Sequence, residues 1–475
     1  MTERTTTDSK FLTAFCAVIA EMDLAVLNLI NVFFIGKGLG DDAVSAYELV
    51  MPCLFLVCGI IALGYNGIQA VCSKDYGSGN KEMFDRHKNA GYTWMIVILA
   101  LIAVLFLIFK EPVLDLLGAN EEGPDIARLS EECYLVFIPC FVLQGFFAVV
   151  SSLLFLEEKK VLITLNIIFY AVFFSGNLLV LNLAPSMTGF IAVNAVSEAF
   201  AVAFVIAYWI LKRERAISAY TVFRVSPKDI KDSVLTGLPD FMEYAFAAVL
   251  SLILNLYMIA RFASNVLAGF GVFEALENIP ELICLAFCFL STATFGVRVG
   301  RVLQAYKPEE RLAAETELEK HSRNLTRAGI VASVVLSVLM ILFARPVVIR
   351  FFTEASDPET VNAAVLLVIS YSVGFTFYML NSEIVCYYKV VKAFWSAHII
   401  FLVEALAFPL LMRIVFGELF GITGFCIGGA AAEILTFIMN LCFVWKSCGH
   451  FPLSFKDFRM DKHIGRMRKN EADLT

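Results

Sequence analysis

Long apolar stretches follow one another along the chain, separated by short polar segments. Each stretch is close to the roughly 20 residues with which a helix crosses the hydrocarbon core of a bilayer. The pattern therefore predicts an all-α integral membrane protein. Twelve transmembrane helices are expected, at about 11–35, 46–72, 92–109, 131–155, 161–181, 187–211, 237–260, 266–294, 326–344, 362–387, 394–416 and 422–445.

Lys and Arg predict the orientation of these helices, because short loops rich in them stay on the cytoplasmic side. If both termini are cytoplasmic, 30 of the 37 Lys and Arg residues fall on that side. We therefore expect a multi-pass protein of the cell membrane with cytoplasmic termini. The outer segments keep the other seven: Lys37, Lys110, Arg128, Arg261, Arg345, Arg350 and Arg413.

The composition agrees with a membrane protein. Of the 475 residues, 59% are hydrophobic and 17% are charged. A soluble domain carries about 25% charged residues, so the surplus of apolar side chains is expected to face membrane lipid. The formal net charge of -7 argues against a nucleic-acid partner.

Several kinds of chemistry lack the residues that they need. The glycines of segment 76–80 are not followed by Gly-Lys-Ser/Thr, so we expect no nucleotide site there. Most of the twelve cysteines lie in apolar stretches and act as small hydrophobes, and neither Cys nor His shows the spacing of a metal site. We therefore expect a transporter without a cofactor, not an enzyme, whose energy comes from an ion gradient or is absent. We also expect a monomer.

The chain contains an internal repeat, which in transporters often marks two halves around a central site. Residues 86–120 line up with 320–354 at an offset of 234, and Glu198 matches Glu433 at an offset of 235. Asn31 matches Asn255 in the same way, at an offset of 224.

These matches predict two parallel six-helix repeats around a central cavity, because an even number of spans leaves both halves pointing the same way. The expected N-terminal lobe covers 1–215 and the C-terminal lobe 237–450. Between them lies a cytoplasmic linker, 216–236, and a cytoplasmic tail follows at 451–475.

Four segments carry a resemblance to a known family. NVFFIGKGLGDDAVSAYELVMP, SKDYGSGNKEMFDRHK, TGLPDF and AFPLLMRIVFGELFGITGFCIGGAAAE are similar, in that order, to the first two helices, the following loop, the start of the second half and the last hairpin of the multidrug and toxic compound extrusion (MATE) family. The resemblance implies an export antiporter that couples entry of H+ or Na+ to the outward movement of organic, often cationic, compounds.

The sequence departs from that family at its usual coupling positions. The first-helix Asp of the family falls at Asn31, and the fifth-helix pair of Asn and Asp falls at Asn177 and Leu181. The seventh-helix Glu of some members falls near Ala247, with Glu243 one turn earlier. Other acids must carry the coupling if it exists.

The first predicted helix contains two such acids, Glu21 and Asp23. A carboxylate at membrane depth is costly and normally faces a protein-lined cavity. The two acids point about 200° apart around the helix, so Glu21 shares a face with Asn28 whereas Asp23 lies nearer Asn31. The alternative is that each pairs with a basic residue.

A second group of acids, Glu274, Glu277 and Glu281, lies on the eighth predicted helix at spacing i, i+3, i+7. This spacing places them on one stripe. One interpretation is a carboxylate face that attracts cations. The other is that one or two lie near the interface or pair with Arg261 or Arg298.

Three more acids complete the candidate substrate and ion site. Glu198 and Glu433 occupy matching places in the sixth and twelfth helices, either as coupling acids or as a shared packing contact. Glu48 is a candidate counterpart of Glu274.

The sequence thus favours a transporter that works by alternating access. The main alternative is a flippase for a lipid-linked precursor, which would need Arg and Lys in its cavity. An integral-membrane enzyme would need a catalytic cluster, and a sensor would need a sizeable soluble domain. The sequence indicates neither. We expect small organic substrates and membrane lipid as the only partners.

Overall fold

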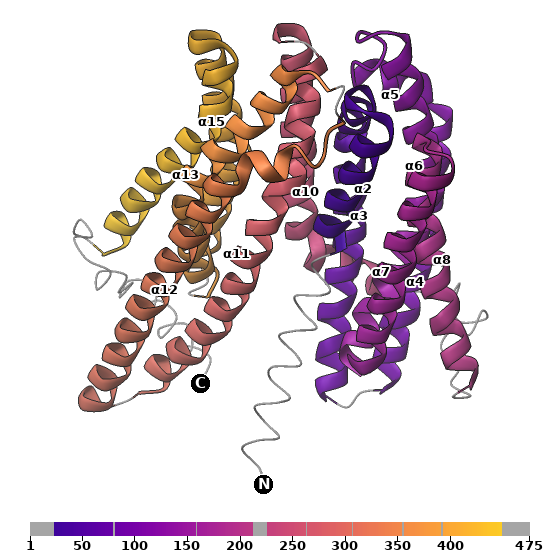
Figure 1. The fold of residues 1–475 in the computed structure, drawn as a ribbon. Helices are drawn as coiled ribbons and strands as arrows, with labels where there is room; N and C mark the ends of the chain where they lie inside the picture. Colours follow the sequence, from indigo (N-terminus) through magenta and orange to yellow (C-terminus); the bar gives the residue numbers. More distant parts are fainter. Residues whose placement is uncertain are drawn as a thin grey trace. The chain divides into compact units, whose positions relative to one another are not determined.

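The computed structural model describes residues 23–78, 81–157, 159–211, 226–262, 264–305, 307–353, 356–390 and 393–448. Helices account for nearly all of these residues, and the described part contains no strand. The helices form two compact units (Figure 1). Unit 1 comprises Met1–Ala275 with Ile349–Val361, and unit 2 comprises Leu276–Val348 with Asn362–Thr475.

Unit 1 holds the helices of the first half of the chain and the first helix of the second half. Its α8, Met187–Leu211, has the bounds predicted from the apolar stretch. The other helices are α2 (Asp23–Leu39), α3 (Asp41–Ser78), α4 (Lys81–Ile108), α5 (Lys110–Leu116), α6 (Pro124–Glu157), α7 (Lys159–Leu183) and α10 (Pro227–Arg261).

Unit 2 holds the rest of the second half. Helix α11 (Ser264–Gln304) passes from unit 1 into unit 2 between Ala275 and Leu276. It is followed by α12 (Pro308–Val348), α13 (Pro358–Val390), α14 (Phe394–Leu402), the π-helical segment η1 (Val403–Ala407) and α15 (Phe408–Cys448).

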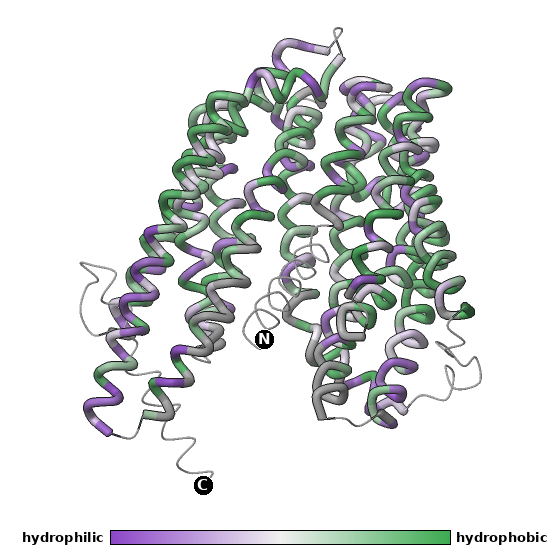
Figure 2. The backbone as a smooth tube through the Cα atoms, turned by 60° about the horizontal axis from the view of Figure 1, so that its bottom comes forward, coloured by the Kyte–Doolittle hydropathy of each residue, from purple (hydrophilic) through white to green (hydrophobic). Residues whose placement is uncertain are grey.

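Several helices extend well beyond their apolar stretches. Helix α12 begins at Pro308, although its apolar stretch was predicted to begin at 326. The extension is polar and carries ion pairs at helical spacing, such as Arg311 with Glu315 at 2.6 Å. Figure 2 shows hydrophilic residues toward the ends of the long helices and hydrophobic residues along their lengths. The length of the apolar stretch therefore reflects the thickness of the membrane, whereas the hydrogen-bonded helix continues beyond it into water.

Two breaks interrupt the last part of the chain. The π-helical segment η1 lies just before Pro409, which has no backbone N–H to continue an α-helix. Within α15, Gly421 has φ 64° and ψ -149°. A Cβ at Gly424 would lie 1.9 Å from the Phe416 carbonyl oxygen, so the two arms of α15 pack back to back as an antiparallel hairpin.

The twelve expected spans can be traced in this arrangement. Nine described helices are long and apolar enough to cross a membrane. One of the nine, Trp395–Ser447, contains the Gly421 break and so supplies two crossings. The other two spans are α2, of which the described part begins at Asp23, and α11.

Helix α10 packs along α3 with almost no side chain between the two backbones. A Cβ added at Gly67 would lie 2.1 Å from the Ser233 carbonyl oxygen, and one at Gly237 would lie 2.0 Å from that of Leu63. This packing explains why α10, which opens the second half by sequence, belongs to unit 1. The lobe boundaries at 215 and 237 concern the sequence repeat and stay a prediction.

Candidate functional site

Unit 1 buries amide side chains at Asn31 and Asn177, the positions where the resemblance to the MATE family would place part of an ion-coupling site. Asn31 of α2 and Asn194 of α8 exchange hydrogen bonds of 3.4 Å, and both are less than 5% exposed. Asn177 of α7 donates to the Phe173 carbonyl oxygen at 3.0 Å. Its own Oδ1 accepts no hydrogen bond from the described residues. These neutral groups can orient a ligand but cannot carry a charge.

Glu48 lies where three helices of unit 1 meet. It is 1% exposed on α3, and its backbone carbonyl oxygen accepts a 2.9 Å hydrogen bond from Asn255 Nδ2 of α10. Its carboxylate reaches α11 at Gly271, where a Cβ would lie 3.1 Å from Glu48 Oε2. The predicted counterpart Glu274 lies one turn further along α11 and is partly buried.

Glu198 is the other buried acid of unit 1. It is 2% exposed on α8. Its neighbours include the thiols of Cys58 on α3 and Cys140 on α6, both close enough to interact with it electrostatically.

In unit 2, the matching acid Glu433 has amide partners. Asn381 Nδ2 of α13 donates to Glu433 Oε2 at 3.1 Å and to the Glu433 carbonyl oxygen at 3.2 Å. Asn440 Nδ2, two turns further along α15, donates to Asn381 Oδ1 at 2.9 Å. Asn381 and Asn440 are fully buried, so the three side chains form one hydrogen-bonded cluster.

A second buried acid of unit 2 has a hydroxyl partner. Glu383 of α13 is 7% exposed and accepts a 2.6 Å hydrogen bond from Thr326 Oγ1 of α12. It lies two residues after Asn381, and therefore faces nearly the opposite side of the helix.

The three acids of α11 are divided between the units. Glu274 belongs to unit 1, whereas Glu277 and Glu281 belong to unit 2. Glu281 is close enough to Glu433 and Tyr371 to interact with both electrostatically. The structure thus brings Glu281 near the Glu433 cluster.

The remaining candidates have different positions. Glu243 is exposed on α10. Glu21 and the side chain of Asp23 lie outside the described residues, although the backbone of Asp23 begins α2.

The expected place of Arg413 in an outer segment was wrong. Arg413 lies in the first arm of α15, is 8% exposed, and holds its guanidinium 5.4 Å from the centre of the Phe425 ring. A Cβ at Gly429 would lie 2.8 Å from its Nη2. Because the hairpin folds the second arm over it, a residue counted as a loop charge becomes a buried cation near Glu433.

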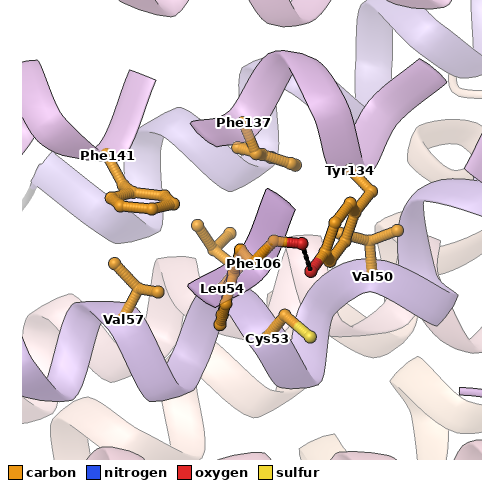
Figure 3. Close-up of a pocket in the computed structure, with 8 residues that line it drawn as sticks. All are labelled: Val50, Cys53, Leu54, Val57, Phe106, Tyr134, Phe137 and Phe141. Carbon is orange, nitrogen blue, oxygen red and sulfur yellow. Dashed lines mark hydrogen bonds between the residues drawn. The ribbon is translucent and has the colours of Figure 1, made fainter. Parts of the chain in front are cut away.

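An apolar pocket in unit 1 offers little to a charged ligand. It is lined by eight side chains from α3, α4 and α6 (Figure 3). Tyr134 Oη, the phenol in this lining, donates to the Phe106 carbonyl oxygen at 3.0 Å. The pocket therefore resembles a packing gap more than an ion site.

The sequence analysis missed Asn194, Asn381 and Asn440 as partners. Each is an amide within a long apolar run. A polar group at membrane depth is costly and normally has a partner, so this signal was sufficient to select them. It did not say which partner each would find.

Comparison with known proteins identifies the architecture. Residues 17–181 match the MatE family model. A structure titled an inward-facing conformation of a multidrug resistance MATE family transporter of the MOP superfamily superposes with a TM-score of 0.77 at 15% identity, over 96% of this chain and 99% of the other. Residues 17–181 are thus similar to the MatE family, and the chain has the fold of MATE transporters.

Two further structures share this MATE fold. A MOP superfamily transporter from Pyrococcus furiosus gives a TM-score of 0.68 at 16% identity, over 91% of this chain and 94% of that one. The Vibrio cholerae MATE transporter VcmN in its bent form gives 0.64 at 16% identity, over 95% and 97%. The search of curated proteins found no match.

These matches confirm the resemblance and the all-α, twelve-helix fold class. The protein is a multi-pass membrane protein with the fold of multidrug transporters. Other MATE structures in the comparison are complexes with the ligands MaD3S and MaL6.

Proposed function

We propose that the protein is a secondary active export antiporter. It moves small organic cations out of the cell in exchange for H+ or Na+ by alternating access. The observation that carries the proposal is the sign of the buried charge. Within the described spans the buried acids are Glu48, Glu198, Glu383 and Glu404, whereas the buried base is Arg413.

This surplus of acids has a physical consequence. Buried carboxylates are stable in an apolar span when they are neutralised by a proton, a cation or a nearby base. A protein that changes which side of the membrane these groups face would move that proton or cation with them. Organic cations are attracted to the same negative potential, so ion and substrate would compete for it.

The flippase alternative has less support. A lipid-linked pyrophosphate would need several converging Arg and Lys side chains, and Arg413 is the one buried base of the described spans. Arg413 is also engaged with the Phe425 ring. The proposed membrane is the cell membrane, with both termini cytoplasmic and the protein a monomer.

Uptake into inside-out vesicles tests this function. A fluorescent organic cation, and a neutral analogue of similar size, would be followed under imposed pH and Na+ gradients. We expect gradient-driven uptake of the cation, reduced by Asp23→Asn or Glu277→Gln if the acids on the first and eighth spans take part. Uptake of a lipid-linked or anionic compound without a gradient would contradict the proposal.

A further inference from the structure

A seam of polar pairs runs between α13 and the second arm of α15 in unit 2. Asn381 pairs with Asn440 at 2.9 Å, and the Tyr388 hydroxyl lies 3.4 Å from that of Ser447. Each pair is separated by 59 residues, and successive members are seven residues apart on each helix. Equal separations mean that the two helices run parallel, with a polar pair every second turn.

Glu433 continues this seam by one more step of seven residues. Its carboxylate Oε2 and its backbone carbonyl oxygen both accept from Asn381 Nδ2. The backbones are close here, since a Cβ at Gly374 would lie 3.0 Å from Ala430 Cα and 3.5 Å from Glu433 Cγ. The carboxylate is therefore held between two closely packed helices.

Two oxygen atoms next to Glu433 have no hydrogen-bond partner among the residues that the structure describes. They are Thr436 Oγ1 and Asn440 Oδ1, and both side chains are fully buried. With Glu433 they are spaced i, i+3, i+7 on α15, within about 60° of one another around the helix. Buried polar atoms rarely stay unsatisfied. The stripe therefore indicates a ligand that several oxygen atoms can coordinate at once.

The charges around the stripe select the ligand. When it is ionised, Glu433 carries one negative charge, and the other charged groups of the described chain that lie close enough to act on it are Glu281 of α11 and Arg413 of the first arm of α15. The last two cancel, which leaves a net charge of about -1. A single positive charge matches this, whereas a divalent cation would leave an uncompensated buried charge.

We propose that Glu433, Thr436 and Asn440 form a binding site for Na+. Carboxylate, hydroxyl and amide oxygens are the donors that hard cations prefer. The inference rests on the proposed function and names the coupling ion and its place. A proton on Glu433 alone would satisfy at most one of the two unpartnered oxygens, whereas a metal cation contacts both.

Unit 1 provides an internal comparison. Its matching acid Glu198 also faces a neighbouring helix, at Cys140, which is the counterpart of Gly374 at the offset of 234. The positions equivalent to Asn381, Thr436 and Asn440 are Phe147, Ala201 and Val205, all buried and apolar. The repeat therefore keeps the acid in both halves but surrounds it with neutral oxygen donors in unit 2.

Binding of Na+ to the purified full-length protein tests the site without transport. Binding of 22Na+ in detergent, and the shift of the unfolding temperature by NaCl against equal KCl or choline chloride, would be compared for wild type, Glu433→Gln, Thr436→Val and Asn440→Val. Asn440→Val introduces the residue of unit 1, and Thr436→Val preserves shape. The control is Ser372→Ala, whose buried hydroxyl donates to the Val368 carbonyl oxygen at 2.6 Å.

We expect the affinity for Na+ to fall at least about tenfold in Glu433→Gln and Asn440→Val, less in Thr436→Val, and not in Ser372→Ala. Unchanged Na+ binding in folded Asn440→Val and Glu433→Gln would overturn the site. Absence of Na+ binding in wild type would also overturn it, and persistent pH-driven uptake would then show that the antiporter function survives with H+ as its ion.

Discussion

Arg86 holds Asp229 with two nitrogens of its guanidinium group, Nε at 3.1 Å and Nη2 at 2.9 Å, and so ties the start of α4 to the first turn of α10. Asp229 is 3% exposed, and His87 Nε2 lies 3.8 Å from its carboxylate. The contact joins parts of the chain that lie 143 residues apart. It fixes the beginning of the second half of the sequence onto unit 1.

Breaking this ion pair should destabilise unit 1. Removing one partner of a buried pair leaves the other charge uncompensated, but half of the Arg86 side chain is exposed, so we expect Asp229→Asn to cost about 1–3 kcal/mol. The pair of Arg128 and Glu132, which is largely exposed, provides a control: Arg128→Gln should cost about 0–0.5 kcal/mol. Thermal unfolding in detergent measures both, and equal losses would contradict the assignment.

The close packing of α3 and α10 predicts a steric effect. A methyl group at Gly67 or Gly237 would meet a backbone carbonyl oxygen near 2 Å, so the helices must move apart, and we expect a loss of about 1–3 kcal/mol for either Ala variant. At Gly271 the nearest atom is the end of the flexible Glu48 side chain. Gly271→Ala should therefore be the milder change, and a ranking in the opposite order would rule out backbone contact as the cause.

Gly421 allows the α15 hairpin through its backbone conformation. With φ 64° and ψ -149° it occupies a region open to glycine, and nothing lies within 4 Å of a Cβ placed there. Gly421→Ala should cost about 1–3 kcal/mol through strain alone. Asn tolerates the ordinary left-handed conformation but not this one, so Gly421→Asn should not rescue stability. Wild-type unfolding temperatures in both variants would show that the hairpin bends elsewhere.

The membrane-spanning part of this fold could be predicted from the sequence, because the bilayer requires an apolar stretch of similar length in every spanning helix. The apolar run 187–211 became α8 with the same bounds. Polar extensions such as the first turns of α12 carry no such constraint, and they were missed for that reason. The last two spans were predicted as separate apolar stretches, 394–416 and 422–445, and the break at Gly421 lies between them.

The hydrogen-bond partners of the buried acids could not be predicted from the sequence, because they depend on which distant helices pack together. An acid at membrane depth stands out in the sequence, which is why Glu48, Glu198 and Glu433 were selected. Their neighbours come from other helices, as Asn381 does for Glu433, and one chain without its fold does not specify that register. Arg413 was misplaced for the same reason, since its burial comes from the arm that folds back over it.

Glu383 offers a test of a single buried hydrogen bond. Thr326→Val preserves the shape of the side chain but removes the 2.6 Å donor to the carboxylate. We expect a loss of about 1–3 kcal/mol, the range for a buried polar group that is left without its hydrogen-bond partner. Combining Thr326→Val with Glu383→Gln should cost less than the sum of the two single changes. Additive losses in thermal unfolding would indicate that the two groups do not interact.

Counterflow of ions during transport tests the central claim most directly. Purified protein in liposomes loaded with a pH-sensitive or Na+-sensitive dye would receive an organic cation on one side, and the ion signal would be compared for wild type, Glu433→Gln and Ser372→Ala. We predict that substrate movement drives H+ or Na+ in the opposite direction in wild type and Ser372→Ala, and that Glu433→Gln abolishes this exchange. Substrate movement without ion counterflow, or full exchange in Glu433→Gln, would contradict an antiporter whose coupling acid is Glu433.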